Sequence, residues 1–154
     1  MTDTLRKSLR FLHTEWRDGE PMTIDQWLSM PCWIVDILPE RVPAEGAGQF
    51  FAVEKFFLQD SALRRKQLDL ILKLNCYYDL TLISENEEAR NPEPAVWAGR
   101  IGREYLNILA GGQALITADH TDTYMTVYTA DDQLLGRIGK LASAEGLFMW
   151  KGNG

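Results

Sequence analysis

One histidine of this 154-residue chain stands next to a carboxylate, in the tetrapeptide Asp119-His120-Thr121-Asp122. A histidine that titrates near neutral pH and is oriented by a carboxylate can act as a general base, and such residues can also bind a metal ion. Both functions need side chains that converge. Neighbouring residues in a turn point apart, and turns favour Asp because it bonds to the local backbone. We therefore expect a turn here, with catalysis through Asp119, His120 and Asp122 as the alternative, and we predict neither a metal nor a cofactor.

A second pattern combines glycine and arginine, because the tetrapeptide Gly-Arg-Ile-Gly occurs at 99–102 and again at 136–139. A basic Gly-x-x-Gly turn between two helices clamps a nucleotide backbone in one class of RNA-binding module. In the first copy, Arg100 and Arg103 would supply the hydrogen-bond donors for a phosphate. The proline-rich residues before this copy cannot form the required helix, however, and the second copy falls inside a predicted helix. We expect solvated arginines in a turn, with phosphate or nucleic-acid binding as the alternative.

Three tyrosines lie on strand faces that a core need not occupy. Most of the 16 aromatic rings in the chain fall on apolar faces of predicted elements. Tyr77 lies on the opposite face of its strand from Tyr78, and Tyr124 and Tyr128 share one face of another strand. If helices cover both faces of the sheet, these rings belong to the core. If one face is open, Tyr77, Tyr124 and Tyr128 form an aromatic platform of the kind that often marks a binding site.

The two cysteines do not form a recognisable site. Cys32 and Cys76 are 44 positions apart, and neither has a second Cys or a paired His nearby, so zinc-ligand spacing is absent. We expect two reduced, largely buried thiols in a cytoplasmic protein, because disulfides are rare in that compartment. The sequence also contains no nucleophile elbow, phosphate-binding loop or dinucleotide fingerprint.

The charge of the chain restricts its partners. Sixteen basic and 22 acidic residues give a formal net charge of −6. Nucleic acids and membrane surfaces are polyanionic, so neither is an expected partner. No secretory signal or apolar stretch long enough to span a membrane is visible. An acidic surface suits a basic protein partner, and self-association is the other possibility.

The elements that would position these residues follow from hydrophobic spacing and from capping residues. Leucines and a tryptophan at helical spacing predict a helix over 3–17, and the Thr23–Gln26 capping box predicts a second. The helices are expected over about 3–17, 23–29, 50–58, 61–74 and 131–146. The strands are expected over about 33–38, 77–84, 113–118, 123–129 and 147–150.

Two regions are less regular. Residues 85–95 are rich in glutamate and proline, and we expect an acidic, mobile loop there. The segment 96–110 fits either a helix or a strand, because Gly99 and Gly102 weaken a helical pattern.

Together these elements predict a single α+β domain over 1–154, with a helical extension at 1–30 and a core at 31–151. The expected core is a mixed sheet of about five strands with helices packed on it, and the ferredoxin-like arrangement is the candidate for a related fold. The function that the sequence favours is that of a non-enzymatic, cytoplasmic binding protein for a basic partner or for itself.

Overall fold

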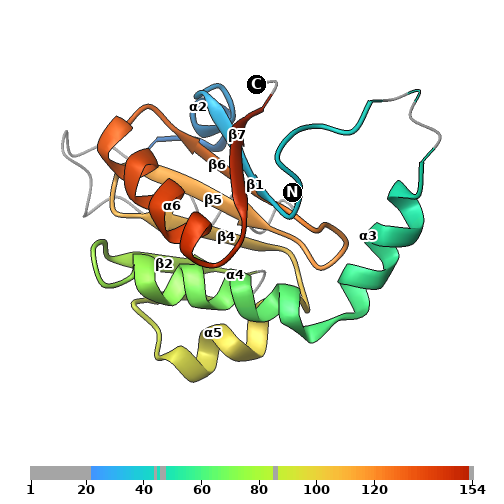
Figure 1. Cartoon of the computed structure of the whole chain (residues 1–154). Helices are drawn as coiled ribbons and strands as arrows, with labels where there is room; N and C mark the ends of the chain where they lie inside the picture. Colours follow the sequence, from blue (N-terminus) through green and yellow to red (C-terminus); the bar gives the residue numbers. More distant parts are fainter. Residues whose placement is uncertain (1–21, 44, 46–47, 85–86, 153–154) are drawn as a thin grey trace.

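A computed structural model describes residues 22–43, 45, 48–84 and 87–152 of the chain. In this part of the chain, seven strands form one sheet with helices packed on it, which confirms the predicted α+β class (Figure 1). The strand order is β3-β2-β4-β5-β6-β1-β7, and every neighbouring pair is antiparallel. The predictions of a mixed sheet and of about five strands are therefore wrong, and the ferredoxin-like relation is not matched exactly.

The described elements follow the predicted order, with additions in two regions. The strands are β1 (Cys32–Asp36), β2 (Leu80–Ile83), β3 (Glu88–Arg90), β4 (Leu106–Ala110), β5 (Ala114–Ala118), β6 (Met125–Thr129) and β7 (Phe148–Lys151). The helices are α2 (Ile24–Leu28), α3 (Phe50–Gln59), α4 (Ser61–Leu74), α5 (Pro94–Arg100) and α6 (Asp132–Ala144). The helix predicted over 3–17 lies outside the described residues.

The additions come from the two regions whose patterns were weak. The expected acidic loop at 85–95 contains strand β3, which pairs with β2, and the beginning of α5. The ambiguous segment 96–110 divides into α5, a turn and strand β4. A helix-to-strand change within 15 residues explains why neither periodicity dominated the sequence there.

One face of the sheet carries the main core. Helices α4 and α6 pack side by side on this face, and α5 lies next to α4. The inward side chains of these helices recur at helical spacing, which keeps them on one side. In α4 and α6 the buried apolar residues are Leu63, Leu70, Ile71, Leu74, Leu134, Leu135, Ile138 and Ala142.

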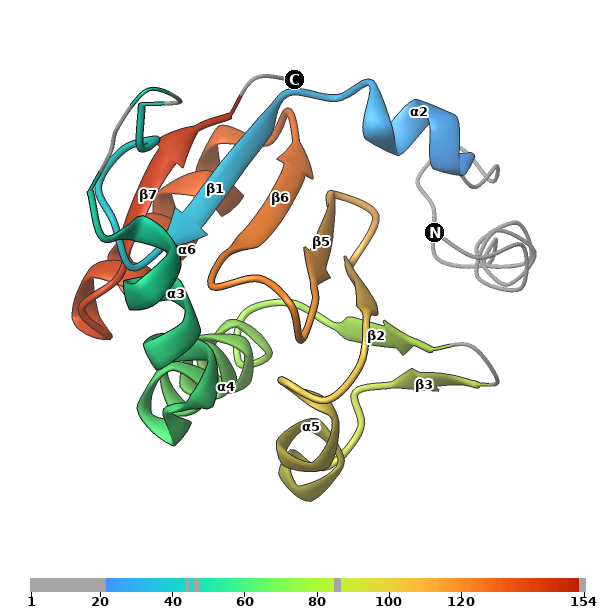
Figure 2. The same ribbon diagram turned by 90° about the vertical axis from the view of Figure 1, so that its right-hand side faces the viewer.

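The other face of the sheet has a smaller cover. Figure 2 shows α2 on the opposite side of the sheet from α6. The predicted capping box begins this five-residue helix, since the Thr23 side chain and the Gln26 side chain each bond to the other residue's backbone N–H. Trp27 of α2 is buried against Leu109 and Leu115, which lie on the second face of the sheet. A helix of this length covers only part of that face.

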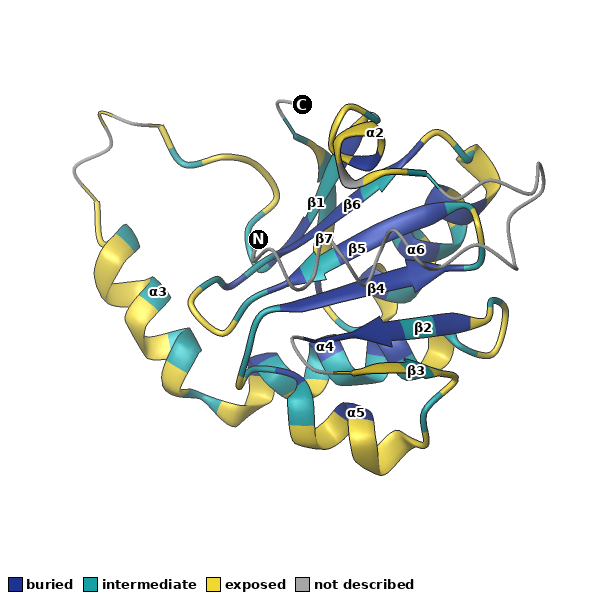
Figure 3. Cartoon of the chain, turned by 180° about the vertical axis from the view of Figure 1, so that it is seen from behind, coloured by how far each residue is buried: buried dark blue, intermediate teal, exposed yellow. Residues whose placement is uncertain are grey.

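Helix α3 lies at the end of the sheet. Phe57 packs against the main core on the first face, but no residue of α3 is fully buried. In Figure 3, α3 projects from the body of the molecule and is largely exposed. It joins α4 at Asp60, whose side chain accepts a hydrogen bond from the backbone N–H of Ala62 and so caps α4.

The two Gly-Arg-Ile-Gly copies take different conformations. The second lies inside α6, as predicted, and there is open space around Gly136. The first ends α5 and turns at Gly102, which has a φ of +82°. The expectation that the proline-rich residues before this copy cannot form a helix is therefore wrong, because Pro94 is accommodated in the first turn of α5. A Cβ atom on Gly102 would lie 2.7 Å from Cδ of Arg64. Gly102 is therefore required both by its backbone conformation and by the close approach of α4.

This difference predicts opposite effects of one substitution. We expect Gly102→Ala to lower the free energy of unfolding by more than about 1 kcal/mol, because a side chain at positive φ is strained and would collide with Arg64. We expect Gly136→Ala to raise stability by up to about 1 kcal/mol, because alanine favours a helix interior over glycine. Urea denaturation measures both; equal effects at the two positions would contradict the assignment of the first copy to a turn.

Candidate functional site

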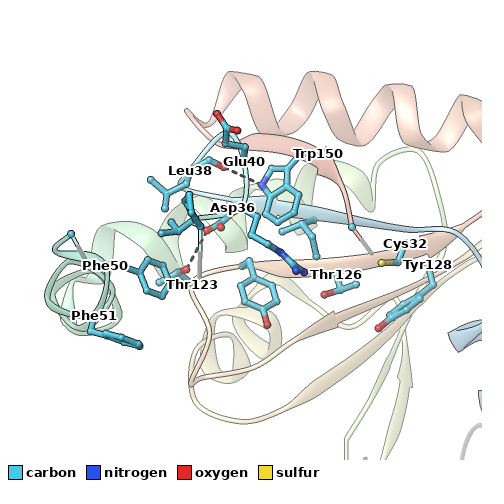
Figure 4. Close-up of a pocket in the computed structure, with 17 residues that line it drawn as sticks. Cys32, Asp36, Leu38, Glu40, Phe50, Phe51, Thr123, Thr126, Tyr128 and Trp150 are labelled. Atoms are coloured by element: carbon cyan, nitrogen blue, oxygen red, sulfur yellow. Dashed lines mark hydrogen bonds between the residues drawn. The ribbon is translucent and has the colours of Figure 1, made fainter. Parts of the chain in front are cut away.

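A cavity of about 520 Å³ opens on the second face of the sheet, over strands β1, β6 and β7 (Figure 4). The register places Cys32 opposite Tyr128 and Ile34 between Thr126 and Trp150. Side chains alternate along a strand, so these residues share one face and form the floor of the cavity. This volume lies within the range of about 300–1,000 Å³ that small-molecule sites occupy.

The walls of the cavity come from the connection between β1 and α3. Leu38, Val42 and Pro43 contribute apolar surface, and Phe50 and Phe51 contribute it from the first turn of α3. The indole Nε1–H of Trp150 donates to the carbonyl oxygen of Leu38 at 3.1 Å. This bond ties the start of the wall to strand β7, so the wall and the floor are held together at that point.

Asp36 is the buried acid of the site. It ends β1 with only 7% of its surface exposed. One carboxylate oxygen accepts hydrogen bonds from the backbone N–H of Ile37 at 2.7 Å and from the Thr123 hydroxyl at 3.2 Å. Loss of solvation by burial raises the pKa of Asp36 in spite of these bonds, which act in the opposite direction. A cation in the cavity would compensate for that lost solvation.

Further acidic groups surround Tyr124, which lines the same cavity. The pKa of Tyr124 is raised by burial and by the nearby carboxylates of Asp122, Asp36 and Glu54. The pKa of Asp122 is raised by burial and by repulsion from Asp119 and Glu54. The repulsion at Asp122, which Arg64 and His120 partly oppose, shows that carboxylates gather at this end of the sheet.

One basic side chain also belongs to the lining. Arg41 lies on the connection between β1 and α3 and is exposed. Among the described residues, no ion pair joins Arg41 to Asp36 or Glu40, the two acidic lining residues. The lining holds two acidic residues and one basic residue, and of its charged neighbours Glu54 and Asp122 are acidic and Arg64 is basic, so acidic residues outnumber basic ones around the cavity.

The structure brings together two of the three predicted tyrosines. Tyr128 lies in β6 and Tyr124 directly precedes this strand. Both lie on the same face as Thr126, and both line the cavity. Tyr77 lies elsewhere, in the turn after α4, and is 59% exposed. The guanidinium of Arg137 lies 4.9 Å from the centre of its ring. No three-tyrosine platform is formed, because Tyr77 precedes β2 instead of lying within it.

Asp119, His120 and Asp122 lie in the turn between β5 and β6, as predicted. Contrary to the expectation that their side chains diverge, Nδ1 of His120 lies 2.9 Å from the Asp119 carboxylate. His120 is exposed, and neither His120 nor Asp119 lines the cavity. The Asp119 carboxylate also accepts from the Thr121 hydroxyl at 2.7 Å. Asp119 therefore hydrogen-bonds within the turn in addition to its contact with the histidine.

Arg64 of α4 holds this turn. Its guanidinium donates to the carbonyl oxygens of His120 at 2.8 Å and of Asp122 at 3.1 Å. The same group donates to the side-chain oxygen of Gln67 at 2.9 Å. The bonds to His120 and Asp122 connect residues more than 50 positions apart, so they fix the β5–β6 turn on α4.

Arg100 and Arg103 do not form a phosphate site in this structure. Arg100 makes ion pairs with Glu87 and with Glu104. Arg103 is exposed in the turn that follows α5. Two carboxylates already neutralise the arginine that would have to bind a phosphate.

Several cavity residues were not predicted. Asp36, Trp150, Phe50 and Phe51 are not among the site residues that the sequence predicts. The available signal was Asp36 itself, a charged residue inside the apolar run Trp-Ile-Val-Asp-Ile-Leu. Charged residues are almost never buried without a reason, so this position marked a candidate site.

The expectation of buried cysteines is correct for Cys32 and wrong for Cys76, which is exposed; neither forms a disulfide.

Comparison of the chain with protein-family models, curated proteins and solved structures finds no significant match. Within the described part of the chain, no group of three or more His, Cys, Asp or Glu side chains is arranged to hold a metal ion. No helix there has the length and apolar character needed to cross a membrane. Any functional interpretation therefore depends on the geometry of the site.

The role of Arg64 predicts a contrast between two residues of the turn region. We expect Arg64→Met to lower the free energy of unfolding by about 2 kcal/mol, because the carbonyl groups of the β5–β6 turn lose a charged donor. We expect His120→Ala to change stability by less than about 1 kcal/mol, as for other exposed positions. Chemical denaturation measures both. A large loss for His120→Ala would show that the imidazole, and not Arg64, stabilises the turn.

The raised pKa of Asp36 predicts how stability depends on pH. The folded protein binds this proton more tightly than the unfolded chain, whose ordinary value is 3.8. The contribution of Asp36 to the stability of the fold is therefore fully present below pH 3.8 and is lost as the pH rises through the pKa of Asp36 in the folded protein. We expect Asp36→Asn to remove this loss and to be at least as stable as the parent protein at pH 7.

Denaturation between pH 4 and pH 7 measures this effect, with Glu93→Gln as a control for the loss of one exposed negative charge. If Asp36→Asn is destabilised at pH 7 by more than about 1 kcal/mol, the carboxylate is a net stabilising group of the fold and the interpretation is wrong.

Proposed function

We propose that this chain is a binding protein that holds a basic side chain of a protein partner in the cavity over β1, β6 and β7. The observation that carries this proposal is a buried carboxylate, Asp36, at the end of an aromatic-lined cavity. An arginine or lysine side chain has an apolar stem and a charged head. The stem would lie along the aromatic walls, and the head would compensate the charge of Asp36.

The chemistry of the lining supports a cationic group. Tyrosine and tryptophan rings attract a cation through their negative faces, by about 0.5–2 kcal/mol. Tyr124, Tyr128 and Trp150 supply three such rings. A charged hydrogen bond to a carboxylate in a site of low solvation adds further energy. Apolar walls with one polar anchor are typical of small binding sites.

The charge distribution supports the same class of partner. The carboxylates of Glu54 and Asp122 add to the negative potential around Tyr124. Such a potential attracts basic partners and raises their association rate. Arg41 opposes this effect, but it is exposed and unpaired with the acidic lining residues, so it can move away from an incoming cation.

The alternative functions have less support from the geometry. The Asp119–His120 pair is the one observation that favours an enzyme, but His120 does not line the cavity. Arg100 is neutralised by two glutamates, which weakens the case for phosphate or nucleic-acid binding. As part of the proposal we place the protein in the cytoplasm, in keeping with its two unpaired cysteines.

Binding of a single side-chain analogue tests the proposal. The probe is N-acetyl-arginine amide, and the control is N-acetyl-citrulline amide, which has nearly the same shape without the charge. We expect the arginine compound to bind with a Kd of about 1 mM and to shift the NMR signal of the Trp150 indole. We expect the citrulline compound to bind at least tenfold more weakly.

Two variants test whether the cavity binds a cation. Asp36→Asn should weaken binding of the arginine compound at least tenfold, whereas Arg41→Gln should leave it unchanged or strengthen it. Loss of binding in Arg41→Gln, or equal binding of the two compounds, would contradict a cation site. Binding of N-acetyl-glycine, an anion, in place of the arginine compound would likewise contradict it.

A further inference from the structure

Helix α3 is apolar around most of its circumference and yet has no buried residue. Phe51 is 81% exposed, Phe56 is 63% exposed and Val53 is 38% exposed. A helix that is hydrophobic on nearly all sides is normally enclosed by other elements. Ala52 lies between these side chains on the outer side of the helix and is exposed as well, as are the polar side chains of Lys55 and Gln59, which helical spacing places between Phe51 and Phe56. We call Phe51, Ala52, Val53 and Phe56 the outer face of α3.

The outer face of α3 is continuous with the cavity. Phe51 belongs to both, since it lines the cavity and begins the outer face. Figure 4 shows Phe50 directed toward Thr123 at the rim, with Phe51 beside it on α3. Glu54, on the same helix, contributes to the negative potential at Tyr124. An apolar surface therefore leads directly into an acidic, aromatic cavity.

Area and charge together restrict what can cover this surface. The rings of Phe51 and Phe56 expose on the order of 250–300 Å² in total, since an aromatic side chain can bury about 150–250 Å². A stable interface needs about 800 Å² on each partner, so a second α3 alone is too small. A second copy would also bring another chain with a net charge of −6 against this acidic end. An anionic membrane is disfavoured for the same reason.

We infer that α3 and the cavity form one docking surface for a basic amphipathic segment of a partner protein. Apolar side chains of that segment pack on the outer face of α3, and one arginine or lysine enters the cavity toward Asp36. Binding of an amphipathic helix by an apolar surface is a common recognition mode. The inference rests on the proposed function, because it uses the same cavity for the basic side chain.

A designed peptide provides the probe. It has 18 residues, with leucine and arginine placed so that one side of a helix is apolar and the other basic. One control peptide has glutamate in place of arginine, and another has the same composition in scrambled order. We expect the basic amphipathic peptide to bind the full chain at least tenfold more tightly than N-acetyl-arginine amide does. Both controls should bind at least tenfold more weakly than the peptide.

The variant Phe56→Ser separates the two proposals, because Phe56 belongs to the outer face and does not line the cavity. It should weaken peptide binding at least tenfold and leave binding of N-acetyl-arginine amide unchanged. The matched control is Tyr77→Ser, which removes an aromatic ring of similar exposure at a different place. That variant should leave peptide binding unchanged.

Each other outcome would overturn the inference. If Phe56→Ser leaves peptide binding unchanged while the arginine compound still binds, α3 is not part of the surface and the cavity proposal stands alone. Concentration-dependent dimerisation that Phe56→Ser abolishes, without peptide binding, would show a second copy on α3. Binding to neutral phosphatidylcholine vesicles that Phe56→Ser abolishes, without peptide binding, would show a lipid surface instead.

Discussion

The unequal cover of the two sheet faces is the constraint on which the rest of the structure depends. The seven-stranded antiparallel sheet has buried apolar side chains on both faces, and the longer helices α4 and α6 both lie on one. On the other side, the five-residue helix α2 packs Trp27 against β4 and β5. In the described part of the chain α2 also contacts β6, and the rest of this side of β1, β6 and β7 is bordered by the connection from β1 to α3, which leaves a cavity.

The position of Asp36 follows from this arrangement. Asp36 ends a strand whose other face belongs to the main core, so its side chain is directed to the poorly covered side. Even there, only 7% of its surface is exposed. Thr123 and the backbone of Ile37 satisfy one of its oxygens. The raised pKa shows that these bonds do not fully replace water. A group that costs stability where a ligand can approach is typical of a binding site.

Much of the fold could be predicted from local patterns. The capping box at Thr23 and the cap at Asp131 begin helices where expected, because capping depends on neighbouring residues alone. The pairing of strands could not be predicted, since an antiparallel sheet with β1 between β6 and β7 is fixed by contacts distant in sequence. Short strand β3 was missed because three residues, two of them charged, show no strand pattern.

The candidate site was predicted only in part for the same reason. Tyr124 and Tyr128 share a strand face, so period-two alternation was enough to associate them. Asp36, Trp150 and Phe51 come from three elements far apart in the chain, and only the tertiary structure brings them together.

Titration of Asp36 by carboxyl-carbon NMR, with and without N-acetyl-arginine amide, is the most direct measurement of whether Asp36 receives a cation. The pKa of Asp36 should lie above 3.8 in the unliganded protein and fall when the arginine compound binds. A value that is unchanged by the compound would contradict the assignment of Asp36 as the group that receives the cation.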